Sequence, residues 1–531
     1  MSTKASAAAS ATSSAPSSSP LLSTTLSLVL LQLVSRLFSF SLNQLLLRST
    51  TPQALGVATM GFEVVRDTGL FLVREGMRGA VVRTRSSASN ELSPQLSRTL
   101  LLPTYLAPLP ILFFGLYSFL APSPLPTHFY STLSLYALSA VLELLGERWY
   151  LHTLLNWETL TSVRVKIEGA AVGVKSVATL AAVFMGGERA ALLAFGVGQV
   201  AYGATLLVGF WWRVGAELKT GGDDGRYDPE VVSTSWALTK QSLVKQLLTE
   251  GDKIAVGRLS KVEDQGGYAV ALNYGSLIAR ILFAPLEETS RLFFSRHLSI
   301  TQPSQADLLS TSTLLSSLLT LHTHLSLIFI LFAPPYTAPL LYHLLGARWS
   351  APLSSAPTIL RAYCTYLPFL AINGVTEAFF QSAAGPEWLK RGSWWMAACS
   401  VGFLGAVIIG ARAGLGEVGL IYANCLNMSL RIAFSSVFIR RFYKEKGAGE
   451  EVWKSLSWRR WAPKLQTVVV FGIAGVVVRR SEAKGGWKSL RGMAEHLGEG
   501  AACGFLCLAV IFVSERKNLR RLAGVVRRKR D

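Results

Sequence analysis

Long apolar stretches alternate with short polar segments along almost the whole chain. Most are as long as a bilayer-crossing helix, which takes roughly 20 mostly apolar residues. Lipid offers no hydrogen-bond partner to an open backbone, so each stretch is expected to be a helix. The predicted spans are 22–46, 55–82, 99–121, 127–150, 158–185, 188–213, 235–259, 266–297, 310–333, 354–383, 390–411, 414–440, 462–479 and 498–514. The pattern predicts an all-α, polytopic membrane protein with about 14 transmembrane helices.

The polar connections divide these helices into units. Residues 1–20 are rich in Ala and Ser and are expected to be disordered. The run GGDDGRYDPE predicts a flexible turn, and residues 441–463 form an amphipathic stretch expected at the membrane surface. The predicted units are a disordered segment (1–20), an N-lobe of six spans (21–214), a flexible connection (215–234), a C-lobe of six spans (235–442), an amphipathic loop with a terminal helix pair (443–515) and a basic tail (516–531).

Some residues recur at similar positions in the two lobes. Val34, Arg48 and Gly56 recur 210 positions later as Val244, Arg258 and Gly266. Gly61, Gly69 and Arg74 recur 206 positions later as Gly267, Gly275 and Arg280. Such matches suggest two related six-helix bundles, an architecture in which a transporter binds its substrate between the repeats.

The composition supports a membrane protein. Only 16% of the residues are charged, whereas soluble domains carry about a quarter. The net charge of +20 would suit a nucleic-acid partner, but no zinc-finger, RNP-like or helix-turn-helix pattern accompanies it, so none is expected. Lys and Arg gather instead in 440–464 and 516–530, which the positive-inside rule places in the cytosol. With an even number of spans, both termini are then predicted to be cytosolic.

The motifs of common enzymes and metal sites do not occur in this sequence. It contains no P-loop, HExxH or GxSxG motif and no acidic DxD loop, so we expect no catalytic residues. The five cysteines form no CxxC pair. His322 and His324 are two positions apart, which does not place both on one helix face. We therefore expect neither a metal nor another cofactor.

The segment LFLVREGMRGAVVR, residues 70–83, combines an apolar run with four charges. Ionised groups in hydrocarbon are costly and usually face a cavity or a partner. Arg74 and Arg78 share one helix face, and Glu75 is able to pair with Arg78. Arg36 lies inside the first predicted span. Two interpretations stay open for Arg36 and Arg74: structural ion pairs, or a cavity that binds an anion.

Several long patterns resemble the Rft family of the endoplasmic reticulum. They are VLLQLVSRLFSFSLNQLLLR, LFLVREGMRGAVVR, VLELLGERW, VRVKIEGAAVG, LTEGDK, DQGGYAVALNYGSLIARILFAPLEETSRLFF and YLPFLAINGVTEAFFQS. That family is similar to the multidrug/oligosaccharidyl-lipid/polysaccharide exporter superfamily. The resemblance implies a multi-pass endoplasmic reticulum protein of N-glycosylation that brings dolichyl-diphosphate-linked heptasaccharide from the cytosolic to the lumenal leaflet by alternating access. The alternative is a protein that binds this lipid without transporting it, as a scaffold beside glycan-assembly enzymes.

The implied substrate directs attention to cations and amides in the spans. Arginine forks suit phosphate oxygens, so the expected diphosphate ligands are Arg36, Arg74, Arg78, Lys166 and Arg280. The expected sugar contacts are Asn43, Gln44, Asn273, Tyr274 and Asn373. The carboxylates expected to pair with nearby cations are Glu75, Glu143, Glu250, Glu287 and Glu288.

Overall fold

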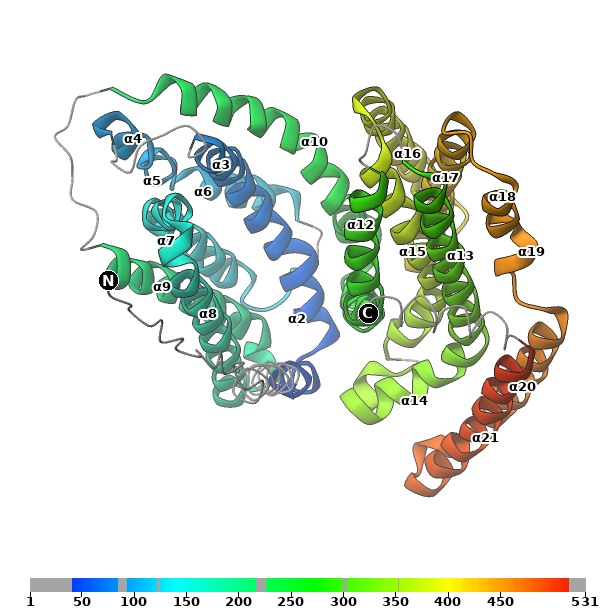
Figure 1. Ribbon diagram of the computed structural model, residues 1–531. Helices are drawn as coiled ribbons and strands as arrows, with labels where there is room; N and C mark the ends of the chain where they lie inside the picture. Colours follow the sequence, from blue (N-terminus) through cyan, green and yellow to red (C-terminus); the bar gives the residue numbers. More distant parts are fainter. Residues whose placement is uncertain are drawn as a thin grey trace, which may run out of the picture.

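The computed structural model describes residues 41–84, 93–121, 125–215, 226–298, 303–351 and 353–514. Within these ranges the secondary structure is helical and contains no strand, which confirms the predicted all-α class. Figure 1 shows two groups of helices beside one another, with α20 and α21 at the outer edge of the second group. The domain boundaries proposed from the sequence remain predictions.

The first group follows the predicted N-lobe. It contains helical residues 41–49, α2 (Pro52–Gly56), η1 (Val57–Phe62), α3 (Glu63–Thr84), α4 (Pro94–Thr99), α5 (Leu102–Tyr105), α6 (Leu109–Leu120), α7 (Phe129–Leu155), α8 (Trp157–Gly186), η3 (Glu188–Ala190) and α9 (Ala191–Val214). The π-turn η1 joins α2 to α3 without a break in the helix. Helix α9 packs along both α7 and α8, and α3 packs on α7.

The rest of the described structure corresponds to the predicted C-lobe and the terminal region, and its first helix, α10, lies along α3 of the first group. Its elements are α10 (Pro229–Leu259), α11 (Val262–Ile278), η4 (Ala279–Phe283), α12 (Ala284–Leu298), α13 (Gln305–Leu327), η5 (Ile328–Phe332), α14 (Ala333–Leu345), η6 (Ala347–Trp349), α15 (Ala356–Ala383), α16 (Pro386–Arg412), α17 (Gly416–Glu445), α18 (Glu450–Leu456), α19 (Trp458–Trp461), α20 (Leu465–Ala483), η7 (Gly486–Lys488) and α21 (Leu490–Ser514). Helix α15 packs against α11, α12 and α17 and lies near the centre of this lobe.

Eight helical segments of the described chain are long and apolar enough to span a membrane. They are Pro94–Leu120, Phe129–Leu155, Ser162–Gly186, Glu188–Val214, Asp264–Leu298, Gln305–Leu345, Pro386–Arg412 and Leu490–Ser514. Helices also occupy the predicted spans at 55–82, 235–259, 354–383, 414–440 and 462–479, but these fall outside the eight. Most of the predicted span 22–46 lies outside the described residues. The total of fourteen therefore stays a prediction.

The two lobes meet where α2 crosses α11. A side-chain carbon added at Gly56 would lie 2.6 Å from the backbone nitrogen of Gly266, and one added at Gly266 would lie 1.8 Å from the carbonyl oxygen of Pro52. Only glycines allow two helices to approach this closely. Gly56 and Gly266 are also one of the residue pairs that recur between the halves. The crossing thus brings together two positions that the sequence pattern relates.

A second contact between the lobes runs along α3 and α10, which pack together over much of their length. Figure 1 shows α10 lying beside α3 before it reaches the other helices of the C-lobe. Gly76 of α3 is closely covered, since an added side-chain carbon would lie 2.3 Å from the carbonyl oxygen of Ser235. Helix α3 is therefore held between α7 of its own lobe and α10.

Candidate functional site

Three arginines on α3 bind two glutamates on α7. Arg66 donates to Glu143 Oε1 from Nε at 2.9 Å and from Nη2 at 2.5 Å. Arg74 Nη1 donates to Glu143 Oε2 at 3.2 Å. Arg78 donates to Glu147 from Nε at 2.5 Å and from Nη2 at 2.8 Å. The Glu143 and Glu147 side chains are only 1% and 2% exposed, so these pairs tie α3 to α7 in a dehydrated environment.

Arg78 is held in this cluster by a carboxylate and by an aromatic ring. Its guanidinium lies over the ring of Tyr150, 3.9 Å from the centroid, while its edge faces Glu147. Glu75, which was expected to pair with it, is exposed and makes no ion pair with a described residue. These contacts favour the ion-pair interpretation for Arg74 and Arg78. Arg36 lies outside the described residues.

A polar cavity of about 480 Å³ lies between helical residues 41–49, α2, η1, α3, α8, α9 and α11. Its charged lining residues are Glu63, Arg66 and Lys175, with the Lys175 ammonium 3.3 Å from Glu63 Oε1. Its amide lining residues are Asn43, Gln199 and Asn273. The cavity therefore has walls from the N-lobe and one wall from α11 of the C-lobe.

Two of the predicted sugar contacts, Asn43 and Asn273, line this cavity. Gln44 and Tyr274 are next to them in sequence and bind each other, with the Tyr274 hydroxyl donating to Gln44 Oε1. That hydrogen bond links helical residues 41–49 to α11. Asn373 is on α15, where its amide donates to Glu377 Oε2 at 3.0 Å, and it is not among the cavity residues.

The remaining predicted cations differ in their position around the cavity. Arg280 Nη2 lies 3.5 Å from the carbonyl oxygen of Asn273, at the edge of the cavity lining. Arg280 is exposed and forms no ion pair with any carboxylate in the described part of the chain. Lys166 is nine residues from Lys175 on α8, which is about half a turn out of phase. Lys166 therefore points away from the wall that Lys175 provides.

The predicted carboxylates are spread over separate contacts. Glu143 is shared by two arginines, as described above, Glu250 pairs with Lys253 at 2.9 Å, and Glu287 pairs with Arg291 at 2.6 Å. Glu288 is exposed and has no ion pair within the described ranges. Of the expected carboxylates, only Glu143 is therefore joined to expected cations.

Three cavity residues were missed as candidates from the sequence. Arg66, Lys175 and Gln199 were not singled out from the sequence. Gln199 is fully buried, and neither atom of its amide has a hydrogen-bond partner among the described residues. The only signal was a single amide in the apolar run GVGQVAYG. A buried amide that faces a cavity without a partner is suited to bind water or the hydroxyl groups of a ligand.

A second ion pair lies in the C-lobe, between α15 and α17. Arg431 Nη2 donates to Glu377 Oε2 at 2.5 Å, and Gln381 donates to Glu377 Oε1 at 3.0 Å. These side chains line a separate cavity of about 250 Å³ together with Trp395 and Phe434, whose rings stack. Glu377 and Arg431 are 18% and 25% exposed, so this pair is more hydrated than the cluster on α3 and α7.

Comparisons with known proteins agree with this architecture. A family model described as Rft protein matches residues 21–524. The Man(5)GlcNAc(2)-PP-dolichol translocation protein RFT1 of Schizosaccharomyces pombe is 35% identical over 439 residues, which cover 77% of this chain and 81% of that protein. The protein of the same name from Xenopus tropicalis is 29% identical over 526 residues, covering 92% and 94%.

Among solved structures, the lipid II flippase MurJ in an inward closed conformation has a similar fold. The TM-score is 0.58 at 13% identity, and the superposition covers 91% of this chain and 99% of that one. At this level of identity the similarity concerns the fold alone. The chain therefore has the fold of an all-α membrane transporter.

Proposed function

This chain belongs to the Rft protein family, and from that premise we propose that it moves Man5GlcNAc2-PP-dolichol between the leaflets of the endoplasmic reticulum membrane. The substrate is a dolichyl-diphosphate-linked heptasaccharide, and the direction is from the cytosolic to the lumenal side. The observation that carries the proposal is that relatives matching most of this chain bear the name of translocation proteins for this lipid.

The polar cavity supports a route for the head group of the lipid. An ionised diphosphate and a heptasaccharide cannot cross hydrocarbon without a polar, hydrated path. The cavity is lined by both lobes, at the place where repeat-built transporters bind substrate. In the proposed cycle, the head group occupies this cavity, the lobes change their relative orientation, and the dolichol chain stays in lipid throughout.

Arg280 is the phosphate ligand that we favour. It adjoins the cavity through Asn273 and has no carboxylate partner in the described chain, so its charge is available to an anion. Arg74 and Arg78 are in a different situation, because a phosphate would have to compete with Glu143 or Glu147. We assign Arg74 and Arg78 to holding α3 in place and Gln199, Asn43 and Asn273 to the sugar.

The proposal also covers the setting of the protein. It is a transporter-like membrane protein and the chemistry of the substrate is unchanged by passage, so no catalytic group and no cofactor enter the mechanism. Both termini are proposed to face the cytosol, with the amphipathic segment α18–α19 on the same side. Glycan-assembly enzymes are proposed as neighbours that produce or consume the lipid.

The test is transport by the purified full-length protein in sealed vesicles that contain the radiolabelled lipid. Movement to the other leaflet at a rate above that of empty vesicles is expected. Arg280→Gln should slow this movement at least tenfold, Arg280→Lys should restore part of it, and Lys166→Gln is the matched control expected to change nothing. Binding of the lipid without movement would overturn transport in favour of the scaffold alternative.

A further inference from the structure

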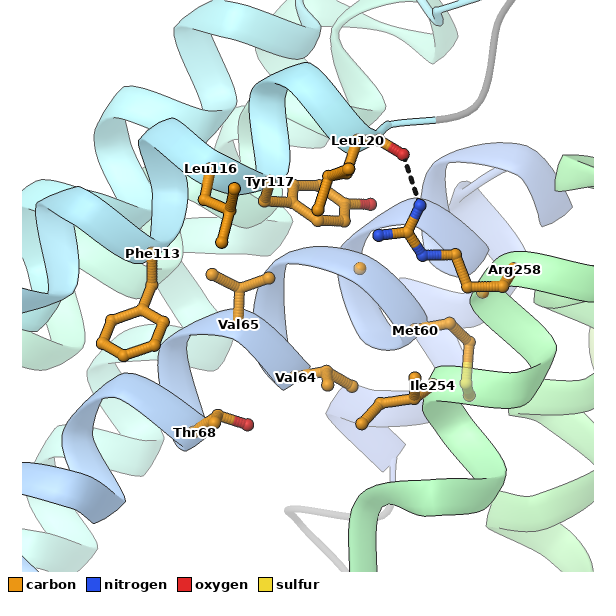
Figure 2. Close-up of a pocket in the computed structure, with 12 residues that line it drawn as sticks. Met60, Val64, Val65, Thr68, Phe113, Leu116, Tyr117, Leu120, Ile254 and Arg258 are labelled. Atoms are coloured by element: carbon orange, nitrogen blue, oxygen red, sulfur yellow. Dashed lines mark hydrogen bonds between the residues drawn. The ribbon is translucent and has the colours of Figure 1, made fainter. Parts of the chain in front are cut away.

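An apolar groove of about 200 Å³ lies between α3, α6 and α10, where the two lobes adjoin (Figure 2). Figure 2 shows Val64 and Val65 of α3 on one side and Phe113 and Leu116 of α6 facing them. Ile254 lines the groove from α10. This groove is distinct from the polar cavity, because it lies on another face of the same helix.

The helix η1–α3 separates the groove from the cavity. Its residues Thr59, Glu63 and Arg66 line the polar cavity, whereas Met60 and Thr68 line the groove. The groove therefore follows this helix over the nine residues from Met60 to Thr68, which span about 12 Å at a rise of 1.5 Å per residue. It opens to the exterior along exposed residues such as Leu116.

One cation stands at the end of this groove. Arg258 Nη1 donates to the carbonyl oxygen of Leu120 at 2.6 Å, as the dashed line in Figure 2 shows. Leu120 is the last residue of α6 and Arg258 is one residue before the end of α10. The guanidinium therefore lies at the level where these helices end, and the apolar walls extend from it toward the middle of the helices.

Arg258 differs from Arg348, which makes a comparable contact, in having no carboxylate partner among the described residues. Arg348 also reaches a carbonyl near the end of a helix, that of Thr50 at 3.3 Å, and in addition it forms an ion pair with Glu188. Arg258 is exposed and has no carboxylate partner within the described ranges. An anion at Arg258 would supply the charge that Glu188 supplies at Arg348.

We propose that this groove binds the phosphate and the adjoining part of the hydrocarbon chain of a polyisoprenyl phosphate lipid. The phosphate would lie on Arg258, and the chain would run along Val64, Val65 and Leu116. A positive group at the helix ends followed by an apolar groove matches the order of phosphate and chain in such a lipid. The inference rests on the proposed function, because it assigns a second site to the same substrate.

The site lies at the membrane face where α6 and α10 end. With the N-terminus in the cytosol, the third and seventh predicted spans, which contain α6 and most of α10, run from the cytosol to the lumen. Both helices then end on the lumenal side. The groove would then receive the lipid in the leaflet to which it is delivered, separately from the cavity that carries the head group. Glu63 and Arg66 on the cavity side and Val64 and Val65 on the groove side would let one helix serve both parts of the route.

Photo-crosslinking of the full-length protein in phosphatidylcholine vesicles tests this site. The probe is a polyprenyl phosphate that carries a diazirine in its second isoprene unit, and labelled peptides are mapped by mass spectrometry. Label is expected in the segments that line the groove, 60–68, 109–120 and 254–258. Label confined to other helices would overturn the proposal. So would the loss of this label when a tenfold excess of an anionic phospholipid is added, if the loss equals that caused by the same excess of unlabelled polyprenyl phosphate.

Three variants and a control separate the parts of the site. Arg258→Gln removes a charged hydrogen-bond donor and should weaken labelling about tenfold at low probe concentration, with partial recovery in Arg258→Lys. Val65→Trp should fill the groove and reduce labelling with Arg258 intact. Ile409→Trp, on an exposed position of α16, should leave labelling unchanged. Unaltered labelling in both Arg258→Gln and Val65→Trp would contradict the proposal.

Transport measured in the same vesicles keeps the two proposals apart. Movement of the radiolabelled lipid without label in the groove would leave the proposed function standing and remove this site. Label in the groove without movement would retain the site and remove transport. Labelling reads binding at equilibrium, so it does not depend on turnover.

Discussion

In the N-lobe, three arginines of α3 share two glutamates of α7, whereas in the C-lobe one arginine of α17 binds one glutamate of α15. The glutamates of the N-lobe are almost fully buried, while Glu377 lies beside a cavity. Burial decides what such pairs can do. A dehydrated cluster holds helices in register and is costly to open, whereas a hydrated pair can exchange its partner for water or a ligand.

The comparison also separates two kinds of arginine in the membrane region. Arg66 and Arg74 are bound to a carboxylate on the neighbouring helix, whereas within the described residues Arg280 is bound to carbonyl groups of its own helix alone. The first kind stabilises the fold, and the second has charge available for an anionic substrate. A charged residue in a membrane helix can therefore serve the fold or bind the substrate. Its interaction partner has to be known before its role can be assigned.

Of the variants that test this comparison, the removal of Glu143 should cause the largest loss of stability. Glu143→Ala removes the buried carboxylate that Arg66 and Arg74 share, although Arg66 keeps Asp67 at 2.6 Å and Arg74 lies 4.0 Å from Glu147. Breaking a buried ion-pair cluster in this way should cost about 3 kcal/mol of unfolding free energy. Thermal unfolding of the purified protein in detergent measures it, with Glu288→Ala on an exposed position of α12 as the control. A melting temperature equal to that of the control would show that the cluster is hydrated like the pair in the C-lobe.

A smaller loss is expected from Arg74→Ala, because Glu143 keeps its two hydrogen bonds to Arg66. We expect a cost of about 2 kcal/mol, as for one hydrogen bond to a charged group. Complementation of a strain that lacks the protein should then fall in step with the amount of folded protein. If activity is lost while the protein level and melting temperature stay normal, Arg74 binds substrate and the ion-pair interpretation is wrong.

Much of the fold could be predicted from the apolar pattern, since the helix Phe129–Leu155 corresponds to the span predicted at 127–150. Gly56 and Gly266, which recur between the halves, also meet where α2 crosses α11, but their recurrence did not predict this contact. The helices depend on local hydrophobicity, whereas their crossings depend on packing. The apolar pattern was therefore sufficient for the helices but not for the points at which they cross.

The site was harder to predict, because it depends on which helix faces meet. Glu143 is 69 positions from Arg74, and no spacing within one helix reveals that contact. On α8, Lys166 and Lys175 are chemically alike, and only the rotation of the packed helix decides that Lys175 lines the cavity. The same reason explains why Gln199 was missed.

The smallest effect should come from the C-lobe pair. Arg431→Gln leaves Glu377 with hydrogen bonds from Asn373 and Gln381, and the adjoining cavity gives water access to the carboxylate. We therefore expect the unfolding free energy to fall by only about 1 kcal/mol, as for a hydrated ion pair, and to depend on salt concentration. The measurement is again thermal unfolding in detergent, at low and high salt, beside Glu143→Ala. A loss as large as that of Glu143→Ala, and independent of salt, would mean that the C-lobe pair is as dehydrated as the cluster on α3 and α7. In that case the difference in burial would not explain how the two lobes hold their charges.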